Sequence, residues 1–567
     1  MTKKINNNRR QFLQNSAFGA AALTAFPSML FAQSSPLRRK ATPSFKADVE
    51  IEFVSRDVYV SVLKTGRKTK VQKYYAKLLK GPKKTLVELK GNYLGPIINY
   101  VKGQKVRIYY KNMMSEPSII HWHGLHVPQD SDGHPMYTLE TGQSHIYEFE
   151  VMNNAGTSFY HSHSHNLTAE QVYKGLAGMI TVTDENEQKL DLPRGEYDLP
   201  FVIQDRTFDE QNQLKYLRGM HGRMTGFLGE SILVNGLPNV EFSVKSRAYR
   251  FRAVNGSNSR IYKLGWDDGT PLTAIGTDAH LLPKPETRPY LMLAPGERID
   301  LWLDFSGRPV GSELVMYSLP YAGAMPPKME EQRLGKKSSG GGMGMGGGMM
   351  GMMSSGVGQG DKFAIATFKV TEKVSDSPKL PKTLGHFERL TERDVDNKHK
   401  PIPIGISMKP MRPQLNGKSF SMNRVLDFEK VELGSIKKIK IFHDHGPMKM
   451  KEGEKMDKGM DISGGGGMGM MGGGMGGGMM MSMAHPIHLH GQQFQILSRE
   501  IEGMRQEEYK TVKDGFLDSG WKDTVLVMPG EEIVIAKPFQ DYKGLFLYHC
   551  HNLEHEDLGM MRQFYIS

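Results

Sequence analysis

The chain has 567 residues, 38% of them apolar, which is enough for several domains that each bury a core of their own. Its formal net charge is +12, but the basic residues are scattered along the chain, which argues against binding to nucleic acid. A single cysteine excludes any disulfide framework within the chain, so the lone thiol must serve another purpose.

Residues 1–33 have the features of an export signal. They contain four basic residues, no acidic ones, and an apolar run over 17–31. The pair Arg9-Arg10, followed by Gln-Phe-Leu, is the twin-arginine form, an address for folded cargo. A general secretory signal or an uncleaved anchor is the alternative, although the apolar run is shorter than the roughly 20 residues of a spanning helix. We expect export by the twin-arginine machinery to the periplasm, and a monomer.

An internal repeat sets the predicted organisation. The turns Gly91-Asn92, Asn235-Gly236 and Asn416-Gly417 each precede a strand of alternating apolar and polar residues. Short strands at close spacing, with turn residues between them, are typical of antiparallel β-sandwiches. We therefore predict an all-β protein with three domains. Their expected ranges are 45–190, 195–373 and 378–567.

Two low-complexity insertions interrupt the strand pattern, at 338–360 in the second domain and 446–483 in the third. Both consist almost wholly of glycine and methionine. A flexible spacer would explain the glycine. The methionines favour a second interpretation, because Cu(I) is a soft ion that thioethers select. We expect these loops to capture or deliver Cu(I).

The only cysteine, Cys550, lies between His549 and His551. In extended backbone, successive side chains leave on opposite faces, so the thiolate would point one way and both imidazoles the other. One tripeptide could then reach two metal centres. His555 and Met560 follow, and with Cys550 and a second imidazole they would complete the His₂Cys site with a weak axial Met that is typical of blue copper.

Further histidines come in pairs two residues apart, which places both members on one face of a strand. The pairs are His121 and His123, His161 and His163, His488 and His490, and His549 and His551. Eight imidazoles would serve as the ligands of three copper ions, two of which bind three imidazoles each and one of which binds two. A lone zinc ion is the alternative, but zinc is normally satisfied by four ligands. Other histidines break this spacing and are expected at the surface or beside the ligands: His126, His165, His443 and His445.

The sequence resembles the multicopper oxidases, and within them the bacterial cuprous oxidases used for copper tolerance. The motifs that carry the resemblance are, in order, HWHGLHVP, FYHSHSH with QVYKGLAGMITV, AHPIHLHGQQFQIL, GWKDTVLV and YHCHNLEHEDLGMM. They span nearly the whole mature chain. The resemblance implies three cupredoxin-like Greek-key β-sandwiches and four copper ions, one of type 1, one of type 2 and two of type 3. The last three would form a cluster between the first and third domains.

The resemblance also implies the ligands of each copper. Type 1 copper would be bound by His485, Cys550, His555 and Met560. Type 2 copper would be bound by His121 and His488. The type 3 pair would be bound by His123, His161, His163, His490, His549 and His551.

The implied activity is that of an oxidase with O₂ as electron acceptor. A reductant gives single electrons to the type 1 site, Cys550 passes them to the cluster, and four transfers reduce O₂ to two waters. This reaction takes up four protons. Asp132 and Glu556 occupy positions that look like the proton-delivery carboxylates of the family, although an ordinary turn or surface acid is the alternative for each.

The donor is the least determined part of the prediction. Candidate Cu(I) ligands near the type 1 site are Met408, Met411, Met481 and Met483. Met481 stands where the family has an acid, so an acidic ligand would have to come from Asp444, Asp457 or Asp461, or be missing. Three functions stay open: a Cu(I) oxidase that also takes Fe(II), a laccase-type oxidase of phenols and aromatic amines, and a non-enzymatic copper buffer.

Overall fold

A computed structural model describes residues 37–567, apart from 90–91, 218, 327–328, 331–332, 334–356, 410–411, 444–482 and 502–504. Residues Leu37–Ser567 pack as one compact unit. The predicted export signal and most of both Gly/Met-rich insertions lie outside the described residues. No helix among the described residues is long and apolar enough to cross a membrane.

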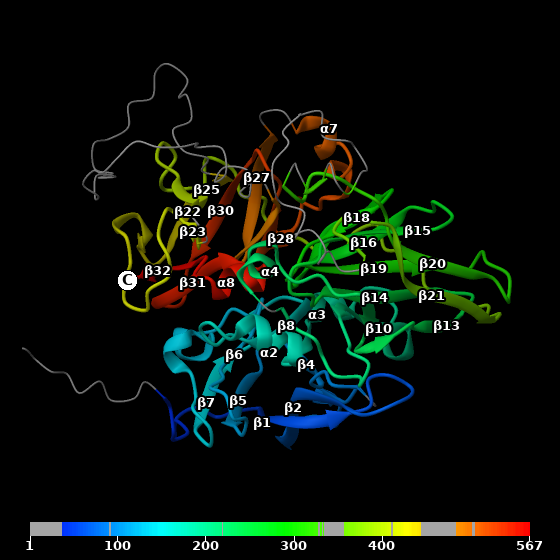
Figure 1. Cartoon of the computed structure of the whole chain (residues 1–567), viewed down its shortest axis with the longest axis horizontal. Helices are drawn as coiled ribbons and strands as arrows, with labels where there is room; N and C mark the ends of the chain where they lie inside the picture. Colours follow the sequence, from blue (N-terminus) through cyan, green and yellow to red (C-terminus); the bar gives the residue numbers. More distant parts are fainter. Residues whose placement is uncertain are drawn as a thin grey trace, which may run out of the picture. The chain divides into compact units, whose positions relative to one another are not determined.

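Three stretches of the chain each fold into two sheets that face one another, so the predicted all-β class is confirmed. The colours of Figure 1 follow these stretches, from blue and cyan through green to yellow and red. The first stretch forms sheets β2-β1-β5-β7 and β3-β4-β9-β8-β6. The second forms β12-β11-β10-β14-β19-β16-β17 and β13-β21-β20-β15-β18, and the third forms β23-β22-β25-β30-β27-β28 and β24-β32-β31-β26-β29.

The elements have the following bounds. The first stretch contains β1 (Val49–Val60), β2 (Thr69–Lys80), β3 (Leu86–Val87), β4 (Ile97–Val101), β5 (Lys105–Asn112), β6 (Ile120–His121), β7 (Ser144–Glu150), β8 (Gly156–Ser162), α2 (Thr168–Lys174), β9 (Ala177–Thr183) and α3 (Glu185–Gln188). The second contains β10 (Asp198–Arg206), α4 (Met220–Thr225), β11 (Ser231–Val234), β12 (Leu237–Pro238), β13 (Glu241–Lys245), β14 (Ala248–Asn255), β15 (Tyr262–Trp266), β16 (Leu272–Thr277), β17 (His280–Arg288), β18 (Leu291–Leu293), β19 (Arg298–Asp304), β20 (Glu313–Ser318) and β21 (Phe363–Glu372). The third contains β22 (Ile402–Lys409), β23 (Arg412–Leu415), β24 (Lys430–Val431), β25 (Ser435–His443), β26 (His485–Leu489), β27 (Phe494–Ile501), α7 (Gln506–Tyr509), β28 (Trp521–Lys522), β29 (Thr524–Val527), β30 (Glu531–Phe539), β31 (Gly544–Cys550), α8 (Leu553–Asp557) and β32 (Met561–Ile566).

Alternation in the sequence explains how each stretch buries its core. In β1, Val49, Ile51 and Phe53 are fully buried, while the residues between them are partly or fully exposed. Each stretch contributes one large cluster of buried apolar residues, as two facing sheets require. The boundaries of three domains stay a prediction, because residues 37–567 pack as one unit.

The sheets differ from the prediction in one respect. Each of the six contains a single parallel pair of strands, so the sandwiches are not purely antiparallel. The parallel pairs are β1–β5, β4–β9, β10–β14, β13–β21, β22–β25 and β24–β32. Parallel neighbours require a crossover connection rather than a hairpin. Alternation within a strand carries no information about the direction of its neighbour, which is why the sequence did not reveal them.

Two of the predicted turns have the backbone conformation that their residues favour. Asn235 and Gly236 have φ values of 51° and 76°, and Asn416 and Gly417 have 53° and 64°. Positive φ at both central residues is the geometry of a tight hairpin turn, which Asn-Gly adopts readily. These turns follow β11 and β23 and help to give the second and third stretches the same strand order near their starts.

Replacement of Phe368 by alanine should destabilise the second stretch. The ring of Phe368 is fully buried, with ring centroids of Phe242, Phe251 and Trp266 at 5.1, 5.2 and 5.1 Å. We expect a loss of about 3–5 kcal/mol in the free energy of unfolding, because the cavity cannot fully collapse. Urea unfolding followed by tryptophan fluorescence measures it. Val310→Ala, at an exposed side chain, should change the free energy little, and equal effects of the two substitutions would contradict the assignment of Phe368 to the core.

Candidate metal centre

The thiol of Cys550 lies between two imidazoles. Its Sγ is 3.5 Å from Nδ1 of His485 and 3.8 Å from Nδ1 of His555. Cys550 ends β31, His485 begins the neighbouring strand β26, and His555 lies in α8. All three side chains are buried. The strand pair and the short helix thus bring together three soft and borderline ligands from two separate segments.

Met560 is held against this group by the backbone. Its N–H donates to the carbonyl of His555 at 2.9 Å, and its carbonyl accepts from the N–H of Cys550 at 3.0 Å. The side chain of Met560 is fully buried. Burial raises the pKa of the Cys550 thiol. A thiolate at this position therefore needs a cation, and a coordinated metal ion would supply one.

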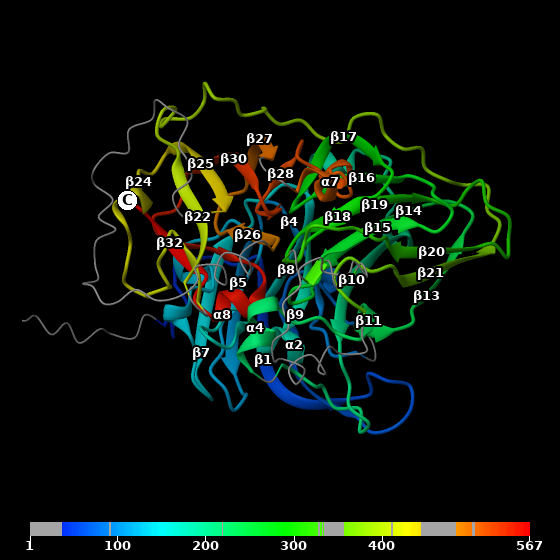
Figure 2. The same ribbon diagram turned by 45° about the horizontal axis from the view of Figure 1, so that its top comes forward.

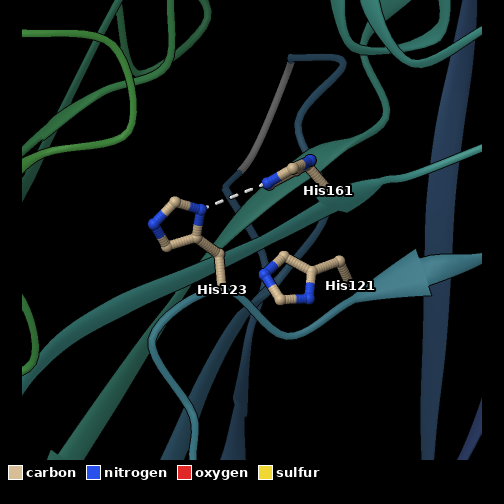
Figure 3. A group of neighbouring side chains, drawn as sticks. All are labelled: His121, His123 and His161. Atoms are coloured by element: carbon tan, nitrogen blue, oxygen red, sulfur yellow. Dashed lines mark hydrogen bonds between the residues drawn. The ribbon is translucent and has the colours of Figure 1, made fainter. Parts of the chain in front are cut away.

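Cross-strand registers bring the paired histidines face to face. In the first stretch, His121 of β6 is paired with His161 of β8, and Figure 3 shows these two rings with His123, whose Nδ1 lies 3.3 Å from Nε2 of His161. In the third stretch, His488 of β26 is paired with His549 of β31. Side chains of opposite residues in an antiparallel pair lie on the same face, so each register places two imidazoles together.

The two sets of rings meet in one buried cluster. Nε2 of His549 is 3.3 Å from Nε2 of His163 and 3.2 Å from Nε2 of His490. The ring centroid of His551 is 5.0 Å from that of His123. His549 and His551 thus point into the cluster, whereas Cys550, between them, points to the other site. The alternation expected of extended backbone is what separates them.

The hydrogen bonds of the rings show that the cluster fits a cation. His121 donates from Nδ1 to the carbonyl of Asp132 at 2.5 Å, and His488 does so to the carbonyl of Asp523 at 2.9 Å. A carbonyl only accepts, so each Nε2 is left with a lone pair, and these two nitrogens are 3.3 Å apart. Burial lowers the pKa of both imidazoles and keeps them neutral. Facing lone pairs repel each other, and copper between them would remove the repulsion.

Asp523 sets the orientation of His123 and was not singled out from the sequence. Nε2 of His123 donates to Oδ1 of Asp523 at 3.0 Å, which turns Nδ1 toward His161, 3.3 Å from its Nε2. Arg298, the first residue of β19, binds both carboxylate oxygens of Asp523, at 2.7 and 2.5 Å. Burial alone would raise the pKa of Asp523, but Arg298 outweighs it and holds the pKa far below the usual range. The guanidinium of Arg298 is therefore one route by which the second stretch reaches the cluster.

Asp132 touches the cluster at two points. Its Oδ2 accepts from Nδ1 of His490 at 2.7 Å, in addition to the carbonyl contact with His121. Oδ1 has no hydrogen-bond partner among the residues that the structure describes. Burial raises the pKa of Asp132, although the nearby charge of Lys537 lowers it. Burial also lowers the pKa of Lys537 to about 7. The carboxyl can therefore hold a proton beside the cluster.

Glu556 contacts different imidazoles of the cluster from those that Asp132 contacts. Its Oε2 is 3.0 Å from Nδ1 of His549, and its Oε1 is 3.6 Å from Nε2 of His163. Glu556 is buried in α8, immediately after His555. It therefore stands where the thiol site and the imidazole cluster meet, rather than on the surface.

The structure describes only some of the remaining predicted residues. Met483 is buried. Met408 lies on β22 opposite Pro413, but its side chain is not described. Met411 and Met481, like Asp444, Asp457, Asp461 and His445, lie outside the described residues. His443, expected at the surface or beside the ligands, is buried, and its ring centroid is 5.6 Å from that of His485.

The chain matches two family models, each described as multicopper oxidase, over residues 70–187 and 476–567. It is 27% identical over 498 residues to the multicopper oxidase mco of Staphylococcus aureus, covering 88% of each chain. It is 28% identical over 474 residues to the laccase of Bacillus subtilis (strain 168), covering 78% of this chain and 79% of the laccase. It is also 36% identical over 238 residues to the cell division protein FtsP of Escherichia coli (strain K12), covering 42% of this chain and 50% of FtsP.

The structure is similar to that of the McoA multicopper oxidase from the hyperthermophile Aquifex aeolicus. The TM-score is 0.69 at 28% identity, over 92% of this chain and 97% of the other. The two family models, the relative from Staphylococcus aureus and the solved structure thus agree in supporting one family, the multicopper oxidases, enzymes that carry copper and pass electrons from a reductant to O₂. The predicted family and its cupredoxin-like fold are thereby confirmed.

Asp523→Asn should weaken metal binding at the imidazole cluster while leaving the thiol site intact. The amide has one acceptor oxygen in place of two, so its NH₂ group must face either a nitrogen of Arg298 or both His123 and Arg298, and loss of such a supporting contact typically costs roughly 10- to 100-fold in metal affinity. Copper retained per chain after dialysis against graded chelator measures this, with the blue absorption as an internal reference. Asp518→Asn, at a partly exposed carboxyl paired with Arg499, is the control. Equal retention in both variants would contradict the role of Asp523.

Proposed function

We propose that the protein is an exported oxidase that couples oxidation of Cu(I), with Fe(II) as a second donor, to reduction of O₂ for copper tolerance. The balanced reaction is four Cu(I), one O₂ and four protons giving four Cu(II) and two waters. The observation that supports it most is the position of Cys550, whose sulfur faces His485 and His555 while His549 and His551 on either side join the imidazole cluster. One tripeptide thus belongs to both centres.

We assign four copper ions to these residues. His485, Cys550, His555 and Met560 would hold the type 1 copper. His121 and His488 would hold the type 2 copper. His123, His161, His163, His490, His549 and His551 would hold the type 3 pair. Copper at these positions would supply one-electron transfer at the first site and four-electron reduction of O₂ at the other three.

Protons for the reaction would come through Asp132 and Glu556. Each is buried, and each is within hydrogen-bond or ion-pair distance of cluster imidazoles, Asp132 at His490 and Glu556 at His549. Their partners differ, so two separate routes can deliver protons to the cluster.

For the electron donor, the Met-rich composition of the sequence ahead of His485 supports Cu(I), because thioethers bind it selectively. Met408, Met411, Met481 and Met483 are its proposed ligands.

The twin-arginine pair Arg9-Arg10 supports export of the folded, monomeric protein to the periplasm.

Two other functions have specific support. The similarity to a laccase favours an oxidase of phenols and aromatic amines built on the same copper ligands. The similarity to the cell division protein FtsP favours a role in cell division, but the buried imidazoles around Cys550 favour an oxidase.

Oxygen uptake separates the donors. The full protein and a variant lacking residues 446–480 would each be given Cu(I), Fe(II) and a phenol. We expect the deletion to abolish Cu(I) turnover, because it removes most of the thioethers that precede His485 in the sequence, and to leave or increase phenol oxidation. Equal loss for all donors, or no change for any, would contradict a Cu(I) oxidase.

Glu556→Gln should slow O₂ reduction by roughly 10²- to 10⁴-fold, because the amide cannot pass a proton to the cluster. The blue absorption should remain, since Glu556 is not a ligand of the thiol site. Stopped-flow reoxidation of the reduced enzyme by O₂ measures the step directly. Glu556→Asp keeps a carboxyl and should recover part of the rate. Unaltered reoxidation in the glutamine variant would exclude the route through Glu556.

A further inference from the structure

Among the side chains that the structure describes, the second stretch contributes no imidazole or thiol to either centre, yet it occupies one edge of the thiol site. Nε2 of His555 donates a hydrogen bond of 3.0 Å to the backbone carbonyl of Met224, at the end of α4. Because the carbonyl only accepts, the hydrogen sits on Nε2 and the lone pair on Nδ1 faces Cys550. His555 is fully buried beneath this contact. Figures 1 and 2 both show α4 beside α8.

The segment that carries this carbonyl, residues 216–227 with the exception of 218, which is not described, is tied to the residue next to His555. Glu554 is buried and accepts four hydrogen bonds from the second stretch. The donors are the hydroxyl of Tyr216 at 2.7 Å, the N–H of Phe227 at 3.1 Å, the side-chain amide of Asn258 at 2.7 Å and the hydroxyl of Ser259 at 2.6 Å. Two of these donors, Tyr216 and Phe227, are the two ends of the 216–227 segment. The carboxylate thus holds the segment at both ends.

The segment is also packed tightly where it passes α8. Gly226 has a φ of +82°, and a Cβ atom at this position would lie 2.3 Å from Oγ of Ser259 and 2.6 Å from Nδ2 of Asn552. Asn552 is the residue that caps the N-terminus of α8. A larger residue at 226 must therefore displace Ser259 and Asn552 or move the segment away from the helix that carries His555, and it must also adopt a strained φ.

The other imidazole of the thiol site has different surroundings. The ring of His485 packs beside that of His443 with 5.6 Å between centroids. His443 ends β25, and residues 444–482, which carry one of the two Gly/Met-rich insertions, follow it in the sequence. The two imidazoles therefore have different neighbours. His555 is hydrogen-bonded to a backbone carbonyl of the second stretch, whereas His485 packs beside His443 at the end of β25.

We propose that the 216–227 segment, held by Glu554, determines donor specificity by closing the His555 edge of the thiol site to organic donors. Electrons from the donor then arrive on the His485 side. Glu554 and Gly226 are positioning residues in this scheme, because they act through the segment and not on the donor. The proposal deepens the proposed function and rests on the assignment of His485, Cys550 and His555 as ligands of one copper.

The contact has a second effect that can be measured without turnover. A hydrogen bond from a coordinated imidazole to a carbonyl fixes the ring and increases its strength as a ligand. A stronger ligand favours the oxidised copper, so the bond to Met224 lowers the reduction potential of the site. Loosening the segment should raise that potential and shift the blue absorption.

The test uses the copper-loaded full chain with Gly226→Ala and with Glu554→Gln. In both variants we expect kcat/KM for a phenol to rise by roughly tenfold or more, while kcat/KM for Cu(I) stays within roughly twofold. The reduction potential measured by redox titration should rise, and the blue band should shift. Glu187→Gln is the matched control, because Glu187 is a buried carboxylate that accepts from Arg194 and Arg250, residues that contact neither centre. It should change none of these quantities.

The outcomes separate two failures. If both variants keep full copper content, the wild-type potential and the wild-type rate with the phenol, the inference about the segment is wrong. If Cu(I) and phenol rates fall together in both variants, the segment only supports the fold, and the inference is again wrong. If the wild-type protein itself lacks the blue band after loading with copper, the proposed function fails instead, because the thiol site does not hold copper.

Discussion

The alternation of side chains at residues 549–551 is the constraint on which both centres depend. Extended backbone sends the sulfur of Cys550 to one side of β31 and the rings of His549 and His551 to the other. The separation of the two sites is thus fixed by a few covalent bonds rather than by the packing of domains. A one-residue shift in the register of β31 against β26 would exchange the faces and dismantle both sites at once.

The second stretch acts on these centres through neighbours of the expected ligands, and none of its described side chains is itself such a ligand. Through Arg298 it fixes Asp523, which in turn orients His123. Through the carbonyl of Met224 it fixes the tautomer of His555.

Much of this arrangement could be predicted from the sequence, because it depends on local periodicity. Spacing by two residues gave the histidine pairs a common face, and the register of β6 with β8 places His121 opposite His161. What could not be predicted depends on contacts between distant segments. Arg298 and Asp523 are 225 residues apart, and neither belongs to a pattern that indicates their pairing. The parallel strand pairs were missed for the same reason, since the direction of a neighbour is not encoded within a strand. Asp523 did lie in a motif, GWKDTVLV, but the motif alone assigned it no role.

The burial of Cys550 gives the protein an internal reporter. With one thiol in the chain, and that thiol inaccessible to water, a thiol-specific reagent can react only when the third stretch opens. The rate of labelling therefore measures local opening at a single, known atom. Comparing that rate with and without copper would give the free energy by which the metal holds this part of the protein closed, without any need to unfold the rest.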